Sequence, residues 1–208
     1  MEPKERILAK AHELFSRYGI RSVSMDDIAT QLGISKKTVY QYYTDKNELV
    51  DAVFSHIMEG NKEHCNVCRE EGKNAIDEVV RSFEMVQELL SQMHPSVLFD
   101  MQKYHPVTYR KFEEYRSGFL YRIIRQNIEA GIKEGLYRED IDVDVLARYR
   151  LHSIMLGFDA NVFPGNKTDL LYIEEQLMLH FLHGIATPKG QKLLQKHKIQ
   201  RTKKNEEA

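Results

Sequence analysis

The chain has 208 residues, of which 42% are hydrophobic and 29% are charged, with a formal net charge of −1. This composition can fill a packed core and keeps the surface soluble. No apolar run approaches the roughly 20 residues of a membrane-spanning helix, and the charged amphipathic start lacks a signal-peptide core. Two cysteines are too few for a disulfide scaffold. We therefore expect a cytoplasmic protein with one large domain, or a small domain fused to a larger one.

The charge is unevenly distributed along the chain. Residues 186–208 carry seven basic and two acidic side chains, so this tail is +5 and the rest of the chain is −6. The first fifty residues are nearly neutral, with eight basic and seven acidic side chains. DNA binding would therefore depend on where individual charges lie. The tail is expected to be solvated, with contact to a DNA backbone or to RNA as alternatives.

The hydrophobic pattern is helical nearly everywhere, without a convincing alternating strand pattern. Residues 7–18 carry one apolar stripe, and Gly19 follows where a helix would stop. Ser24 and Ser35 are good N-caps for two further short helices. A longer connector helix, apolar on one side, is predicted over residues 44–58. This order predicts three short helices and a connector within about sixty residues.

Longer helical stripes follow, predicted at residues 76–90, 96–104, 112–135, 145–158 and 169–185. The last of these is apolar on two faces, which one thin layer cannot bury. We therefore expect a homodimer that forms through two C-terminal helices, at about 142–160 and 169–185. A central core helix is the alternative interpretation of the last stripe.

Residues 24–43 have the parts of a helix-turn-helix. Ala29 is small where two helices would cross, Gly33 permits the positive φ of the turn, and Ile34 can fill the angle between the helices. Ser35 would cap the second helix, so that its free N–H groups could face a phosphate.

The second helix of this motif has an outer face suited to DNA. Val39 points inward, which leaves outside Lys36, Lys37, Thr38, Tyr40, Gln41 and Tyr42. Lysine supplies charge, threonine and glutamine reach base edges, and tyrosine hydroxyls donate to phosphates. The alternative is a solvated helix face with incidental tyrosines.

These residues carry a family resemblance. From about Arg6 to Phe54, the segments ILAKAHELFSRYG, RSVSMDDIATQLGIS and KKTVYQYYTDKNELV resemble the DNA-binding domain of the tetracycline-repressor (TetR) family. The family usually has Phe where Tyr43 stands, so this chain adds a hydroxyl to a core ring. The resemblance covers about a quarter of the chain, and the rest is similar only in its helical pattern.

The resemblance implies a role for each matching residue. Phosphate contacts would come from Ser24, Ser35, Tyr40, Tyr42 and Lys46. Base contacts would come from Lys36, Lys37, Thr38 and Gln41. Val39 and Tyr43 would be packing residues.

The resemblance also implies an all-α fold, with an N-terminal three-helix helix-turn-helix domain and a C-terminal helical domain for ligand binding and dimerisation. The expected boundaries are 1–46 for DNA binding, 47–187 for ligand binding and dimerisation, and 188–208 for a basic, flexible tail. The family binds palindromic operator DNA as a dimer, and a small-molecule ligand in the second domain releases it. Two recognition helices must then match major grooves roughly 34–36 Å apart, or a multiple of that spacing.

The ligand domain has candidate pocket residues for an apolar or aromatic small-molecule effector. They are aromatic, histidine and methionine side chains, several of them near a helix break: Phe83, Phe99, Tyr104, His105, Tyr109, Phe119 and Met155. Each of them, taken singly, is also an ordinary core residue.

Two other functions remain open. Cys65 and Cys68 share a helix face, with His64 beside them, so a redox- or metal-responsive regulator is one alternative; incidental cysteines are the plainer interpretation. A helical enzyme using Glu113, Glu114 or Asp159 is the other, but no nucleophile–base signature, phosphate loop or metal spacing supports it. We therefore expect no catalytic site, no metal and no cofactor.

Overall fold

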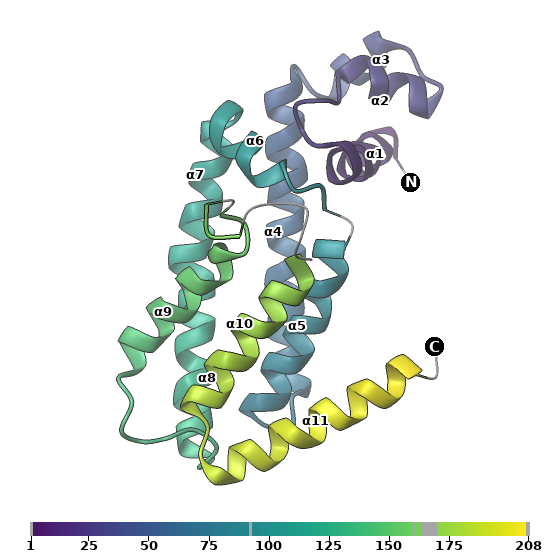
Figure 1. Ribbon diagram of the computed structural model, residues 1–208. Coiled ribbons are helices and arrows are strands. Elements are labelled where there is room, and N and C mark those ends of the chain that lie inside the picture. The colour runs from purple at the N-terminus through teal and green to yellow at the C-terminus, as the bar shows by residue number, and fades with distance from the viewer. Residues whose placement is uncertain (1, 92, 160, 164–169, 207–208) are drawn as a thin grey trace. The chain divides into compact units, whose positions relative to one another are not determined.

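The computed structural model describes residues 2–91, 93–159, 161–163 and 170–206, and within these ranges it contains helices and no strand. An all-α fold is thereby confirmed (Figure 1). None of the described helices is long and apolar enough to cross a membrane. In chain order the helices are α1 (Pro3–Tyr18), α2 (Met25–Leu32), α3 (Lys36–Tyr42), α4 (Lys46–Glu71), α5 (Ala75–Ser91), α6 (Val97–Tyr104), α7 (Pro106–Tyr115), the π-helical segment η1 (Arg116–Leu120), α8 (Tyr121–Lys133), α9 (Val143–Leu156), α10 (Leu170–Ile185) and α11 (Pro188–Glu206).

The chain divides into two compact units that are interleaved in sequence. Unit 1 comprises residues 1–63 and 88–117, and unit 2 comprises residues 64–87 and 118–208. The chain passes between the units three times, each time inside a helical segment: α4, α5 and η1. The expected division after residue 46 therefore differs from the division into compact units, because α6 and α7 belong to the same unit as the first three helices.

Unit 1 has one hydrophobic core, which α1 to α4 and α6 share. Ile7, Ile28, Val39 and Leu49 are fully buried in it, at 0% exposure. The apolar stripe of each short helix thus faces the same interior, as the spacing of the stripes predicts. Met101 joins this core from α6.

The irregular link between α1 and α2 is held by residues distant in the sequence. The backbone N–H of Arg21 donates to the buried Asp100 carboxylate of α6 at 3.0 Å. The Lys46 ammonium, at the start of α4, donates to the Ile20 carbonyl at 2.6 Å. The His94 N–H donates to the Ser16 carbonyl at 2.6 Å. The first two bonds satisfy partly buried backbone groups of the link, and the third satisfies a carbonyl in the last turn of α1.

Unit 2 has a second core, in which Tyr137 is fully buried. The Tyr137 hydroxyl donates to Asn127 Oδ1 at 3.3 Å, and the Asn127 amide donates to the Ala75 carbonyl at 2.9 Å. The Tyr137 ring packs directly on the backbone of Gly131 in α8, where a methyl group would overlap the ring. Gly131 is therefore required by close packing rather than by a turn.

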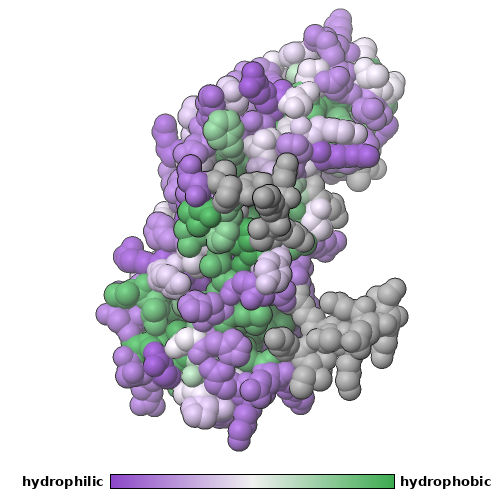
Figure 2. Space-filling view, in the orientation of Figure 1, coloured by the Kyte–Doolittle hydropathy of each residue, from purple (hydrophilic) through white to green (hydrophobic). Residues whose placement is uncertain are grey.

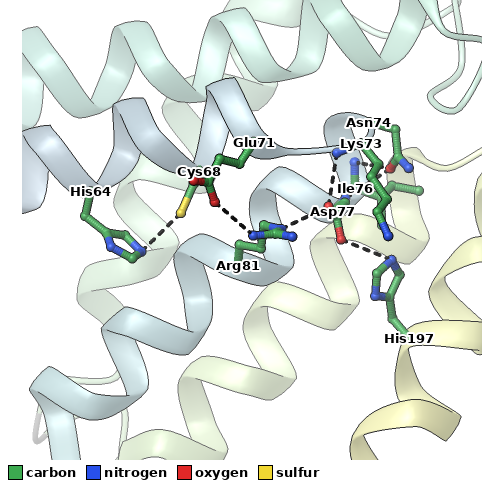
Figure 3. A network of polar contacts seen from close by, with 9 residues as sticks. All are labelled: His64, Cys68, Glu71, Lys73, Asn74, Ile76, Asp77, Arg81 and His197. Carbon is green, nitrogen blue, oxygen red and sulfur yellow. Dashed lines mark hydrogen bonds and ion pairs between the residues drawn. The ribbon is translucent and has the colours of Figure 1, made fainter.

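Two elements differ from the sequence predictions. The stripe predicted over residues 112–135 is interrupted by η1, which contains Gly118, a poor helix former. The tail predicted to be flexible from residue 188 forms α11. Pro188 starts this helix, Leu194 is buried in the unit 2 core, and His197 Nε2 lies 3.9 Å from Asp77 Oδ1 (Figure 3).

Glu174 of α10 is an acidic side chain in the interior of unit 2, with only 2% of its surface exposed. Its Oε1 has no hydrogen-bond partner in the described part of the chain. Burial raises the pKa of this carboxyl to about 7, although the Arg150 guanidinium and the Gly157 backbone N–H oppose the shift. Glu174 is therefore largely neutral in the folded protein at pH 6.

We expect Gly131→Ala to lower the free energy of unfolding by about 2 kcal/mol or more, because the new methyl group forces the Tyr137 ring out of its position. The matched control is Gly60→Ala on the exposed side of α4, where a Cβ meets nothing within 4 Å. This control gains up to about 1 kcal/mol of helix propensity. Urea denaturation at one fixed protein concentration measures both, and equal effects of the two substitutions would contradict the packing at Gly131.

We expect the folded wild-type protein to lose up to about 3 kcal/mol of stability through Glu174 between pH 5 and pH 8. The unfolded carboxyl ionises near its ordinary pKa of 4.5, whereas the folded carboxyl ionises at about 7. The stabilising contribution is therefore complete below pH 4.5 and is lost as the pH rises through 7. Glu174→Gln removes this dependence, while Glu139→Gln, at an exposed position, keeps it. Denaturant unfolding across the pH series tests this, and parallel curves for Glu174→Gln and wild type would refute it.

Candidate DNA-binding site

Two serine caps fix the helix-turn-helix, as the sequence predicts. The Ser24 hydroxyl accepts from the Asp27 N–H at 3.1 Å, and the Ser24 N–H donates to the Asp27 carboxylate at 2.7 Å, which forms a capping box. The Ser35 hydroxyl accepts from the Thr38 N–H at 3.1 Å. Between the caps, Gly33 has φ +64°, the left-handed conformation that lets the chain turn from α2 into α3. The two cap hydroxyls are thus already bonded to their own helices.

The outer face of α3 is polar and exposed around the buried Val39. Lys37, Tyr40 and Gln41 are exposed, and Thr38 is half-buried. Lys36 also lies outside, where its ammonium is 2.9 Å from the Asp26 carboxylate of α2. Lys37 has no carboxylate partner among the described residues. Lys37 is therefore the unneutralised cation of this face.

Tyr42 and Lys46, which are expected to contact DNA, are partly buried, and Tyr43, which is expected in the core, is buried. Tyr42 is half-buried, and its ring packs against the unit 1 core. Partial burial lowers the pKa of the Lys46 ammonium, and the nearby carboxylates of Asp100 and Asp27 oppose this shift. Tyr43 is a core residue, as expected from its position, and its added hydroxyl lies 3.5 Å from the Lys4 carbonyl, which accepts from it. The departure from the family's usual Phe is thus accommodated by a local hydrogen bond.

The candidate pocket residues divide between the two units. Phe99, Tyr104, His105 and Tyr109 belong to unit 1, whereas Phe83, Phe119 and Met155 belong to unit 2. In unit 1, His105 is buried and its Nδ1 lies 2.8 Å from Asn47 Oδ1, while Phe99 and Tyr104 are exposed. In unit 2, Phe83 is buried in the core. Their roles in ligand binding stay predictions.

The cysteines of α4 are buried and form no disulfide, and Figure 3 shows the Cys68 side chain directed at His64. Cys68 Sγ lies 3.1 Å from His64 Nε2. Burial raises the pKa of Cys65 to about 11 and also raises the pKa of Cys68. No cluster of three or more His, Cys, Asp or Glu side chains suited to a metal occurs within the described ranges. Both thiols are therefore largely protonated at neutral pH, which disfavours thiolate chemistry.

Two acidic residues shape the site from outside the set predicted from the sequence. Asp26 lies in the first turn of α2, where an acidic residue suits the helix N-terminus, and it also pairs with Lys36 ten positions later. Asp100 holds the link before α2 from 79 positions away. Neither pairing has a local sequence signal, because each joins segments that only the fold brings together.

Comparisons with known proteins agree with this geometry. Residues 7–53 match the family described as bacterial regulatory proteins, tetR family. YvaF of Bacillus subtilis, an HTH-type transcriptional regulator, is 30% identical over 102 residues. The match covers 49% of this chain and 53% of YvaF, so the matched part of this chain spans about half the length of that relative. The HTH-type transcriptional repressor KstR2 of Rhodococcus jostii is 22% identical over 192 residues, which cover 89% of this chain and 92% of KstR2.

A solved structure shares the fold over most of the chain. It is FadR of Thermus thermophilus, a TetR-family transcriptional repressor in complex with lauroyl-CoA. It is 20% identical, covers 88% of this chain and 95% of its own, and superposes with a TM-score of 0.56. The helix-turn-helix geometry, the matched residues 7–53 and the relatives point to one conclusion: residues 7–53 form a helix-turn-helix domain of the tetR family, and the chain resembles transcriptional regulators over most of its length.

Proposed function

We propose that this regulator is a homodimeric repressor that binds a palindromic operator through α3 and is released by a small-molecule effector. The observation that carries the proposal is the outer face of α3, where Lys37, Tyr40 and Gln41 are exposed on a helix capped at Ser35. Charged, phenolic and amide donors on one short helix fit both phosphates and base edges in a major groove. Acting on bacterial DNA would place the protein in the cytoplasm.

The proposed phosphate contacts are Ser24, Ser35, Tyr40, Tyr42 and Lys46. The proposed base contacts are Lys36, Lys37, Thr38 and Gln41. Because Lys36 is paired with Asp26, its contact with DNA would require an exchange of partners. Lys46 already donates to the Ile20 carbonyl, but an ammonium has three donors, so it can also serve a phosphate.

We infer that the dimer forms through α9 and α10, because large apolar side chains remain exposed on both helices. Val145, Tyr149 and Leu156 of α9 and Tyr172 of α10 are all exposed. Figure 2 shows hydrophobic residues at the surface over the region where Figure 1 draws α9. Exposed apolar side chains gathered on two helices mark an association surface. The expected ranges 142–160 and 169–185 include residues 160 and 169, which lie outside the described residues.

The effector of the proposed repressor is an apolar or aromatic small molecule. Phe83, Phe119 and Met155, which all belong to unit 2, are the proposed contacts. The complex of the FadR relative with lauroyl-CoA supports an effector with an apolar part. An effector changes DNA binding only by its differential affinity for the bound and released conformations.

We expect Lys37→Ala and Tyr40→Ala each to weaken operator binding by at least about tenfold, because each removes an exposed donor from the recognition face. The operator is first isolated by selection from genomic DNA with the wild-type protein, and binding is then measured by fluorescence anisotropy. Lys133→Ala, which removes an exposed lysine of unit 2, is the control and keeps wild-type affinity. Wild-type affinity of both recognition-helix variants would refute the assignment of α3.

We expect Val145→Glu and Tyr172→Glu to convert the dimer to a monomer, because each places a charge in a surface that dimerisation buries. These side chains are 59% and 56% exposed, so the substitutions leave the fold of the subunit intact. Sedimentation measures the association state, and binding to the palindrome falls with it. Val67→Glu, on the exposed side of α4, is the control that stays dimeric. Dimers of unchanged stability in both variants would exclude this interface.

A further inference from the structure

A cluster of basic and aromatic side chains lies on unit 1 outside the helix-turn-helix. Its members are Arg21, from the link before α2, and Phe99, Lys103 and Tyr104 of α6. The Arg21 guanidinium lies 5.3 Å from the Tyr104 ring centroid. The Lys103 ammonium lies 5.4 Å from the same ring and 5.3 Å from the Phe99 ring. We call these four residues the α6 patch.

The cations of the α6 patch are not neutralised. Arg21 and Lys103 are exposed, and neither has a carboxylate partner among the described residues. The nearest acidic side chain on α6, Asp100, is buried, and it accepts hydrogen bonds from the Arg21 backbone N–H and the Ser96 hydroxyl. The patch therefore presents two free positive charges beside aromatic rings that restrict their positions.

The exposed Tyr104 adds a neutral donor to these charges. Its hydroxyl has no hydrogen-bond partner in the described part of the chain. A guanidinium, an ammonium and a phenol hydroxyl are three of the groups that proteins use to contact the phosphates of DNA. A patch built for an apolar partner would not keep two unpaired cations at its centre.

The α6 patch is continuous with the proposed DNA-binding site. Arg21 lies three residues before the Ser24 cap, and its carbonyl is 3.5 Å from the Lys46 ammonium, a proposed phosphate contact. The Arg21 backbone is also tied to α6 through Asp100. The patch and the recognition helix belong to one compact unit, so they are presented to a ligand together.

We propose that the α6 patch binds the phosphate backbone of DNA that flanks the operator, so that the footprint of each subunit extends beyond the base pairs read by α3. The inference rests on the proposed function, and it adds a contact that carries affinity without reading sequence. Phe99 and Tyr104 then act as surface platforms for cations rather than as walls of an effector pocket.

The test compares two duplexes that carry the operator selected by the wild-type protein. One ends at the palindrome, and the other has about ten further base pairs on each side, one helical turn. We expect wild type to bind the longer duplex more tightly and with a steeper salt dependence. Arg21→Gln and Lys103→Gln each lose this gain, and the slope of log K against log salt decreases by about 2 for the two cations removed per dimer. Their affinity for the short duplex stays that of wild type.

The control is Lys133→Gln, which removes one exposed charge of unit 2 and leaves both affinities unchanged. Tyr104→Phe, which keeps the ring and removes the hydroxyl, loses part of the gain. Equal binding of Arg21→Gln, Lys103→Gln and wild type to the longer duplex overturns the inference and leaves the proposed function intact. A changed association state in these variants with unchanged DNA affinity assigns the patch to a protein partner and also overturns it. A wild-type protein that binds no duplex overturns the proposed function itself.

Discussion

The hydrogen bond from the Arg21 N–H to the buried Asp100 carboxylate is the contact on which the position of the DNA-binding helices depends. The link between α1 and α2 has no regular backbone pairing, so its polar groups need partners from elsewhere. Asp100 supplies one from α6 and Lys46 supplies another from α4. Losing either would leave a buried polar group unsatisfied, at a cost of about 1–3 kcal/mol. The orientation of α2 and α3 is therefore set by residues that come after them in the chain.

This dependence gives the proposed effector response a physical route. The helix that holds the link, α6, lies between two of the three points at which the chain passes from one compact unit to the other. Each passage is made inside a helical segment, which transmits a displacement along its length better than an irregular linker does. The third passage lies in η1, and π-helical segments of this kind occur often at functional sites. A conformational change in unit 2 can thus be transmitted to unit 1 along continuous helical segments.

Local sequence signals were enough to predict the helix-turn-helix, because its determinants are short in range. The caps at Ser24 and Ser35, the turn at Gly33 and the inward position of Val39 all follow from spacing of a few residues. The remaining features depend on contacts between distant segments. The close approach of Tyr137 to Gly131, the buried Glu174 and the docking of α11 through Leu194 have no local pattern that distinguishes them from ordinary residues. The basic composition of the tail predicts solvation and gives no sign that Leu194 is buried.

The two thiols of α4 are an intrinsic probe of internal motion. Cys65 and Cys68 are buried in unit 2, and burial also keeps them protonated, so an alkylating reagent has neither access nor a thiolate to attack. Their labelling would therefore proceed through transient opening of the surrounding helices rather than from the closed fold. The rate of thiol modification therefore reports how often the surrounding helices open, without any introduced probe.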